Sequence, residues 1–427
     1  MNRSILAVLL GTFSLRFSTG LTGGLLVYYL DQLPSYGGPH VSSTTVGLLT
    51  AGYYLAELAL SPVFGFLSDR FGAHRIMQVG PIFGLSAVLI TSFVVDLSIL
   101  GGTRILEGGA AAASIPSILG YIALATSGDQ ALRGRAVARF EGATLAGIGL
   151  GIVAAGPIFD AIGRGGFLVN GAIYLVSFAL YRWGVAELHH EPTEEELTAG
   201  TNHVRPSSLD LARYRRILSS SGVWLLAPTW IALNAVIGSW TTQSVFQLVR
   251  TPPEQFHNQL LMQGFSPTSV SLGFGVLGLI FTAGLLYWGN RFKQQRRTTI
   301  IAIGVVGALV MLVATFGLNH SGELGLVVQL PLGAVAAAGL FVMAGATPAA
   351  LGLLADMTES HPADRGAIMG LYSVFLGVGQ ILGALASGPA GDWAGIDGLL
   401  GASVLLIIIA MLPVQRLRRS EHLIGAR

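Results

Sequence analysis

Cysteine is absent from the 427-residue sequence, and charged side chains make up only 11% of it. Without cysteine the chain forms no disulfide bond and no thiolate metal site. Soluble domains carry about 25% charged residues, whereas here 52% of the residues are hydrophobic and the mean hydropathy is +0.66. This composition is that of a membrane protein. Lys293 is its only lysine, so arginine supplies nearly all of the positive charge.

Enzyme motifs are missing as well. The sequence contains neither a nucleotide-binding glycine loop nor an H-E-x-x-H metal motif, and no nucleophile stands beside a base in a recognisable pattern. We therefore expect a protein that is not an enzyme, needs no metal or cofactor and binds no nucleic acid.

Twelve apolar segments are long enough to cross a bilayer as helices, which takes about 20 residues. The segments are 4–30, 44–67, 75–95, 98–126, 136–159, 165–187, 222–249, 267–289, 298–318, 323–355, 366–390 and 395–414. Cytoplasmic loops carry an excess of basic residues. With both termini in the cytoplasm, only Arg164 and Arg250 fall outside, while Arg16 and Arg104 lie within spans. We expect a multi-pass protein of a bacterial inner membrane or an archaeal membrane.

A polar stretch separates the sixth span from the seventh. It contains an acidic run at 191–196 and a basic run at 213–216, so we expect a cytoplasmic linker at 189–220 between two six-helix bundles at 1–188 and 221–427. Within the linker, Leu209–Leu218 is compatible with a short amphipathic helix at the membrane surface. The His189–His190–Glu191 cluster has metal-ligand side chains, but we interpret it as part of a solvated linker.

An internal repeat relates the two halves. Gly151-x4-Gly156-Pro157-x2-Asp160-x2-Gly163 recurs as Gly383-x4-Gly388-Pro389-x2-Asp392-x2-Gly395, and Gly147 matches Gly379 at the same offset. Span 5 therefore corresponds to span 11, as in transporters built from parallel repeats. We expect these glycines to give smooth packing faces at the interface between the halves, since small residues let helices approach closely. The expected interface glycines are Gly147, Gly151, Gly156, Gly379, Gly383 and Gly388.

The loop after the second span reads Gly65-Phe-Leu-Ser-Asp69-Arg70-Phe-Gly72-Ala-His-Arg75. It resembles the motif G-x-L-x-D-R-x-G-x-x-R of the major facilitator superfamily, and the spans, linker and repeat extend the resemblance over essentially the whole chain. The resemblance implies an all-α membrane protein with 12 transmembrane helices in two pseudo-symmetric bundles, acting as a monomer by alternating access. It also implies that Gly65, Asp69, Arg70, Gly72 and Arg75 form a cytoplasmic latch, with Gly65 at a close helix crossing. The corresponding site at Gly289-Asn290-Arg291 lacks the acid and predicts a weaker latch.

Two further segments resemble motifs of this superfamily. Arg104-Ile-Leu-Glu107-Gly108 resembles R-x-x-Q-G, whose arginine is implicated in proton coupling, with Glu107 in place of Gln. Because residues at i and i+3 share a helix face, the two can pair; Glu107 either only neutralises Arg104 or exchanges protons. Gly147-x3-Gly151 resembles the glycine motif of the antiporter branch, but Ile152 replaces its proline, which weakens the case for antiport.

Five charged residues lie inside apolar spans of the first half: Arg16, Glu57, Arg104, Glu107 and Glu141. A charge at the centre of a membrane helix costs roughly 2.5–3.5 kcal/mol on insertion scales. Burial raises the pKa of a carboxylate and a neighbouring arginine lowers it, so the wetness of such a site can decide whether a glutamate carries a proton. We expect Glu57 or Glu107 to be the proton carrier, with Arg16 and Arg104 holding the ionised form. Glu141 ranks third, since it lies near a helix end.

The second half contains no comparable charge, and its polar and aromatic residues are the expected substrate contacts, although packing is the commoner use of each. These residues are Trp230, Asn234, Trp240, Gln243, Gln247, Gln329, Tyr372 and Gln380, with Asn234 and Gln243 the best candidates. We predict a proton-coupled exporter of a small lipophilic or amphipathic compound. A nutrient symporter and a lipid or glycolipid flippase are the alternatives. A strongly acidic substrate is disfavoured, because both arginines already face glutamates.

Overall fold

The computed structural model describes residues 3–127, 129–188, 223–251, 254–293, 295–359 and 365–424. Within these ranges the chain forms α-helices and short 3-10 helices and contains no β-strand, which confirms the all-α fold class. The linker expected at 189–220, including its amphipathic segment and its histidine cluster, lies outside the described residues.

The chain divides into two compact units, Met1–Leu25 with Leu55–Arg213 and Leu26–Tyr54 with Tyr214–Arg427. The boundary between Leu25 and Leu26 lies inside the first helix, and the boundary between Tyr54 and Leu55 lies inside the second. The end of the first helix and the beginning of the second therefore belong to the unit that holds the C-terminal helices. The bundles expected at 1–188 and 221–427 divide the sequence by its repeat, and that division stays a prediction.

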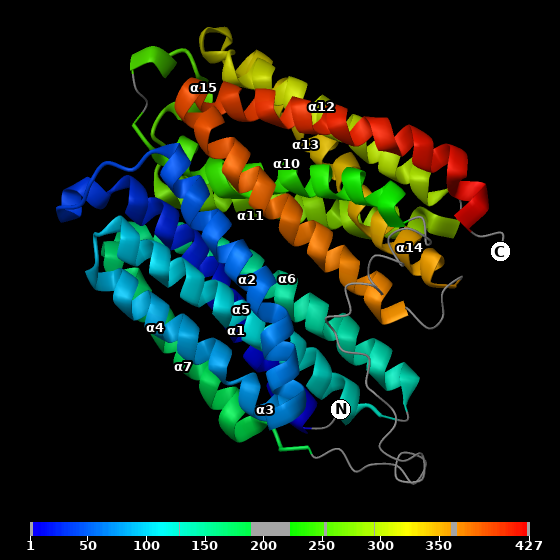
Figure 1. Cartoon of the computed structure of the whole chain (residues 1–427). Helices are drawn as coiled ribbons and strands as arrows, with labels where there is room; N and C mark the ends of the chain where they lie inside the picture. The colour runs from blue at the N-terminus through cyan, green and yellow to red at the C-terminus, as the bar shows by residue number, and fades with distance from the viewer. Residues whose placement is uncertain are drawn as a thin grey trace. The chain divides into compact units, whose positions relative to one another are not determined.

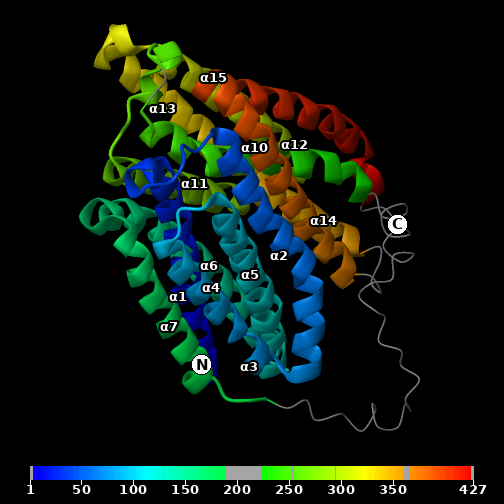
Figure 2. The same ribbon diagram turned by 60° about the vertical axis from the view of Figure 1, so that its left-hand side comes forward.

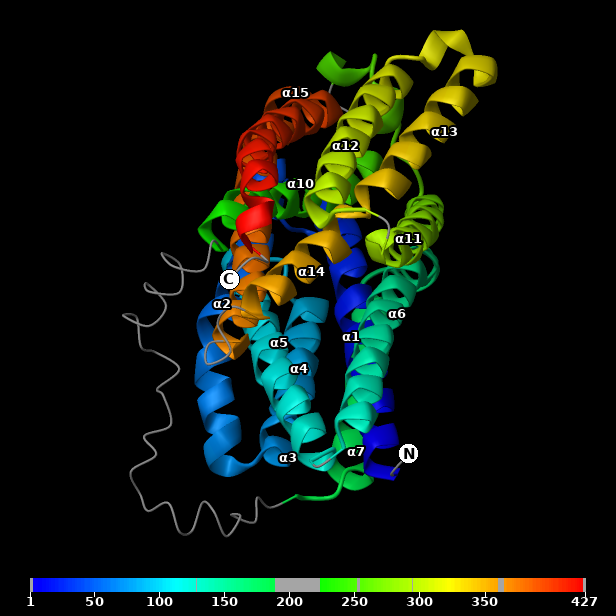
Figure 3. The ribbon, with the colours of Figure 1, turned by 90° about the vertical axis from the view of Figure 1, so that its right-hand side faces the viewer.

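The first unit is a bundle of long helices (Figure 1). Its elements are most of α1 (Arg3–Asp31), the later part of α2 (Ser43–Phe71), α3 (Ala73–Ile76), α4 (Val79–Phe93), α5 (Leu97–Ala125), α6 (Gln130–Ile162), η2 (Gly163–Gly165) and α7 (Gly166–Gly184). Helix α4 packs against both α5 and α7, and α6 runs beside α1 (Figure 3). This arrangement brings α1, α5, α6 and α7 together around the charged residues of the first half.

The second unit holds the remaining helices (Figure 2). Its elements are η1 (Leu33–Tyr36), α10 (Val223–Val249), η4 (Glu254–Phe256), η5 (Leu260–Met262), α11 (Pro267–Gly289), η6 (Asn290–Lys293), α12 (Arg297–Asn319), η7 (Gly322–Leu324), α13 (Leu326–Met343), α14 (Ala346–Glu359) and α15 (Arg365–Ile424), with the parts of α1 and α2 named above. Helix α15 packs along α10, and α12 packs against α13, α14 and α15.

Each of the twelve expected spans coincides with helical structure, and three junctions depart from a simple pattern. The third span is interrupted between α3 and α4, and the tenth consists of α13 and α14 with a turn between them. The eleventh and twelfth spans join in α15, which is broken at Ala394 and Gly395, where Gly395 has φ +60°. A positive φ favours glycine because it has no Cβ. Within the described residues, nine segments are long and apolar enough to cross a membrane, and Ala131–Gly184 and Ser373–Arg416 each cover two spans.

Polar side chains mark where helices begin. Asp96 accepts hydrogen bonds from the backbone amides of Ser98 (2.9 Å) and Ile99 (3.0 Å) at the start of α5. Asp129 accepts one from Leu132 (2.8 Å) at the start of α6. These bonds satisfy amides that have no partner within the helix, so the sequence fixes the beginning of both helices locally.

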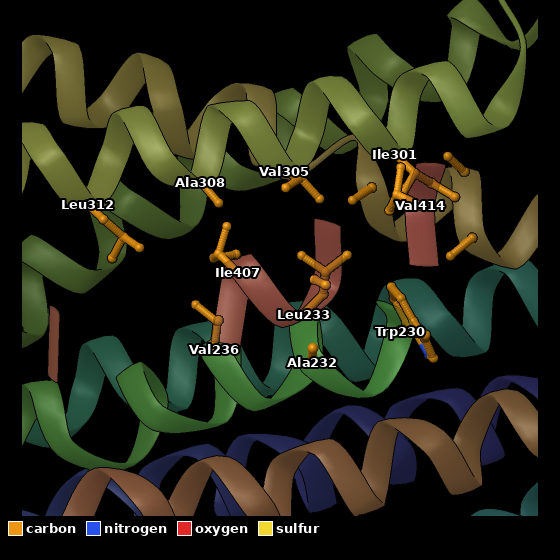
Figure 4. Packing of buried hydrophobic residues seen from close by; sticks show 14 of the residues in the cluster. Trp230, Ala232, Leu233, Val236, Ile301, Val305, Ala308, Leu312, Ile407 and Val414 are labelled. Atoms are coloured by element: carbon orange, nitrogen blue, oxygen red, sulfur yellow. The ribbon is translucent and has the colours of Figure 1, made fainter. Parts of the chain in front are cut away.

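The core of the second unit includes a layer of closely packed apolar side chains between the helices α10, α12 and α15. Figure 4 shows Val305 and Ala308 of α12 facing Ile407 of α15, with Leu233 and Val236 of α10 on the other side. All five side chains are fully or almost fully buried. In a membrane this contact rests on close packing, since lipid tails are as apolar as the side chains themselves.

Candidate functional site

Arg104 and Glu107 form a buried ion pair one helical turn apart on α5. The guanidinium Nη2 of Arg104 contacts Oε1 of Glu107, and the two residues are only 6% and 4% exposed. The i,i+3 spacing places them on one face, as the sequence predicts. A pair buried this deeply is sensitive to protonation, because neutralising the acid leaves the arginine charge uncompensated.

Helices α1, α4 and α7 complete the surroundings of this pair. Tyr174 of α7 interacts electrostatically with Glu107 and Arg104, and its hydroxyl interacts with those of Thr19 and Thr22 of α1. Its ring lies on Gly84 of α4, where an added Cβ would stand 2.3 Å from the ring. Tyr174 therefore connects the ion pair to the polar side of α1.

A second tie joins α7 to α1 nearby. Asn170 donates hydrogen bonds to Oγ1 of Thr22 (2.7 Å) and to the backbone oxygen of Ser18 (3.1 Å), and all three residues are fully buried. Sequence reasoning missed Tyr174, Thr22 and Asn170. The available signal was weak, namely polar side chains in otherwise apolar spans, and it does not say which helices come together.

Arg16 lies on α1 and is 7% exposed. It interacts electrostatically with Glu141 of α6 and with Tyr181 of α7. Its Cβ lies 2.9 Å from the position of a Cβ added at Gly147, so α6 approaches α1 closely at the base of Arg16. Among the described residues, Arg16 makes no hydrogen bond and no ion pair. The two arginines therefore differ in their pairing, since only Arg104 contacts a glutamate directly.

The remaining expected proton carriers are less enclosed. Glu141 is exposed, although it lies well inside α6. Glu57 lies on α2 and is half-buried, and its backbone oxygen accepts a hydrogen bond from Ser61 (2.6 Å). Of the three acids, Glu107 alone combines deep burial with an arginine partner one turn away.

The repeated glycines pack helices inside a unit. A Cβ added at Gly151 would stand 2.2 Å from the backbone oxygen of Phe17 on α1, and one at Gly383 would stand 2.1 Å from that of Ala235 on α10. Gly147 and Gly379 face the same two helices. The expectation of a contact between the halves is therefore wrong for these four glycines, because each faces a helix of its own bundle. Gly388 instead approaches Ser43 and Thr44 of α2.

Most residues of the second half that were expected to contact substrate instead pack in the core or form hydrogen bonds within the protein. Trp230 is buried in the apolar core (Figure 4), and Asn234 donates to its backbone oxygen (2.8 Å). Trp240 donates to Oγ of Ser403 (2.9 Å), and Gln329 donates to the backbone oxygen of Ser321 (3.1 Å). The Tyr372 side chain lies outside the described residues. Gln380 has a buried amide oxygen without a hydrogen bond, and this oxygen faces Gly238 of α10.

Gln243 and Gln247 tie α10 to the first residue of α2. Gln243 donates to the backbone oxygen of Ser43 (2.7 Å), and Gln247 donates to its Oγ (2.8 Å). Arg250 reaches the same Oγ (3.2 Å) and the backbone oxygen of Gly391 (3.3 Å). Gln243 of α10 therefore binds the first residue of α2. Its place in the middle of the span had suggested a contact with substrate in a cavity.

Comparison with known proteins decides the family. Residues 8–337 match the family model of the Major Facilitator Superfamily. The chain belongs to this superfamily. As a member it is a multi-pass membrane transporter and not an enzyme.

Relatives of this superfamily member include drug-resistance proteins. Quinolone resistance protein NorA of Staphylococcus aureus (strain MSSA476) is 22% identical over 424 residues, covering 97% of each chain. Multidrug resistance protein 2 of Bacillus subtilis is 32% identical over 139 residues, covering 33% of this chain and 32% of its own. Among solved structures, the nucleoside transporter NupG has a TM-score of 0.74 at 12% identity, covering 97% of this chain and 99% of its own. The D-xylose-proton symporter has a TM-score of 0.65 at 17% identity and 96% coverage of each chain, so it too shares the fold.

The superfamily loop forms the corner between α2 and α3. Gly72 has φ +92°, which lets the chain turn sharply after α2. Asp69 and Arg70 are exposed, and the Arg70 guanidinium lies 5.4 Å from the centre of the Phe71 ring. Arg75 pairs with Glu187 (3.0 Å) beyond the end of α7. These contacts fix the corner within its own unit, and the latching role of the loop stays a prediction.

The close helix crossing expected at Gly65 is not seen. A Cβ added at this position would meet no atom within 4 Å. The glycine is therefore not required by packing within the described residues, unlike Gly151 or Gly383.

Proposed function

We propose that this transporter exports a small amphipathic compound in exchange for protons, with Glu107 as the proton carrier and Arg104 as its counter-charge. The buried Arg104–Glu107 pair carries the proposal. With Glu107 ionised, the two charges compensate one another. With Glu107 protonated, a buried guanidinium loses its partner, and a conformation that gives it water or another anion becomes favourable. Protonation is thereby linked to the choice of conformation.

The direction of transport rests on the relatives. Similarity to the quinolone resistance protein extends over 97% of both chains, which supports export of a compound with an apolar body. The membrane orientation with cytoplasmic termini, the monomeric state and the latch at Asp69 and Arg70 belong to the same proposal. They agree with the arrangement of basic residues along the sequence.

Proton flux in proteoliposomes tests this function. With a pH gradient imposed, addition of an amphipathic substrate should start a proton flux opposite in direction to substrate movement. Glu107→Gln should abolish this coupled flux, whereas Glu323→Gln, a control at an exposed glutamate of η7, should leave it intact. Movement of substrate with the protons would establish symport instead. Full coupled flux in Glu107→Gln would exclude Glu107 as the carrier.

A further inference from the structure

Arg16 is a buried cation without a direct partner. It is 7% exposed, and within the described part of the chain it has neither a hydrogen bond nor an ion pair. An arginine stays charged in proteins and carries five N–H donors in a planar fork. No nitrogen of Arg16 is among the fully enclosed side-chain atoms without a hydrogen bond, so the guanidinium keeps some accessible surface through which a ligand can reach it. Arg104 of the same unit differs from Arg16, because it contacts a glutamate directly.

The protein groups around Arg16 are occupied or distant. Tyr181 donates its hydroxyl to Thr12 (3.5 Å), and Ser177 donates to the backbone oxygen of Gly11 (2.9 Å). Glu141 acts on Arg16 electrostatically, without a direct ion pair, and its own side chain is exposed. Among the described residues of this unit, no carboxylate therefore makes the direct two-oxygen contact that a guanidinium binds best.

Helix α6 approaches α1 closely at the base of Arg16. At Gly147 of α6, an added Cβ would be 2.7 Å from the backbone oxygen of Phe13, 2.9 Å from Cβ of Arg16 and 3.0 Å from the backbone nitrogen of Phe17. The glycine thus lets α6 close onto α1 at this level. The close crossing therefore places Arg16 at the contact between α1 and α6.

Aromatic rings lie beside Arg16 on the same helix. Phe13 and Phe17 are half-buried, with ring centroids 6.3 Å apart, and positions i, i+3 and i+4 share a helix face. The combination is a cation next to apolar, aromatic surface. It suits a ligand with an aromatic body and one negative charge.

We propose that Arg16 binds the carboxylate of an aromatic amphipathic substrate, as the specificity-determining charge of the transport site. The inference rests on the proposed export function and names the chemical class of its substrate. It also revises the sequence-based expectation that acidic substrates are disfavoured. That expectation held that both arginines face glutamates, and in the structure only Arg104 does so directly.

Binding of a matched pair of probes tests the assignment. The probes are 1-pyrenebutyrate and its methyl ester, which differ in the negative charge, and the full-length protein in nanodiscs is titrated with each at pH 7. Wild type should bind the acid more tightly than the ester after subtraction of binding to empty nanodiscs. Arg16→Gln should weaken binding of the acid about tenfold or more and leave the ester unchanged. Arg16→Lys should keep part of the preference, since it retains the charge but not the fork.

Arg182→Gln is the matched control, because it removes an exposed arginine of α7 and should not change either affinity. Equal binding of acid and ester by wild type, or an unchanged preference in Arg16→Gln, would overturn the assignment while leaving the export function standing. If Arg16→Gln does not fold, the wild-type preference and its partial retention in Arg16→Lys decide the matter. Failure of wild type to bind either probe would contradict the amphipathic substrate class itself.

Discussion

At the scale of single residues, substitutions of the Arg104–Glu107 pair can distinguish its effect on folding stability from its effect on proton coupling. Removing one member of a buried pair leaves the other charge exposed to low dielectric and costs about 3–5 kcal/mol, whereas replacing both with apolar residues is often neutral or stabilising. Both members are almost fully buried. The two kinds of substitution therefore have opposite consequences for folding.

We expect Glu107→Leu alone to lower the thermal unfolding temperature clearly. The double variant Arg104→Met with Glu107→Leu should recover it, because no uncompensated charge remains. Proton-coupled flux should be lost in both. Thermal unfolding in detergent and flux in proteoliposomes measure the two properties separately. A double variant that is both stable and fully coupled would show that the pair does not carry protons.

The pairing of Arg104 with Glu107 could be predicted because it depends only on spacing along one helix. Tyr174 and Asn170 could not, because their contacts join α7 to α1 and α5, and periodicity within a span does not specify its neighbours. Gln243 was misplaced for a related reason. Helix α10 is apolar over most of its surface, so its sequence gives little sign of which face meets α2 and which faces a cavity.

At the scale of elements, close packing of α6 on α1 depends on one glycine face. A Cβ at Gly151 would overlap the backbone oxygen of Phe17 at 2.2 Å, whereas Gly149 of the same helix has open space. Gly151→Ala should destabilise the protein by about 1–3 kcal/mol through overpacking. Gly149→Ala, the control, should be neutral or slightly stabilising because alanine favours helix. Chemical unfolding of the two variants measures the difference, and equal stabilities would contradict the close contact.

The first turn of α2 is capped from α15. Asp392 accepts hydrogen bonds from the amides of Ser43 (2.7 Å) and Thr44 (2.9 Å) and from Oγ1 of Thr44 (2.6 Å). Loss of a helix cap costs about 0.5–2 kcal/mol. Asp392→Ala should therefore speed hydrogen exchange at the first amides of α2, and Asp392→Asn should do so less, since its amide oxygen still accepts. Exchange rates equal to wild type in Asp392→Ala would refute the cap.

At the scale of the whole molecule, the compact units do not follow the sequence repeat. The helical segments could be predicted from hydropathy, since a span must cover the apolar thickness of a membrane, and the count of twelve spans stays a prediction. The assignment of residues 26–54 to the unit of the C-terminal helices could not. It depends on contacts such as those of Ser43 with Gln243 and Asp392, which join positions 200 and 349 residues apart.

Separate expression of the two sequence halves tests this organisation. Residues 1–188 alone would leave the beginning of α2 without its partners on α10 and α15. We expect this fragment to be protease-sensitive within 26–54 when expressed alone and protected when co-expressed with residues 221–427. Limited proteolysis of both preparations measures the effect. Equal protection in the isolated fragment would show that these residues fold without the second unit.

Helix α2 is fastened at both ends to different units. Its first residue is held by Asp392 and Gln243, and the corner beyond its last residue is held by Arg75 and Glu187. Helix α2 therefore contributes residues to both units, and each unit fixes the end that belongs to it. Pro62, inside the helix, removes one backbone hydrogen bond and marks the point of least resistance to bending. We therefore expect any bend of α2 to lie at this proline.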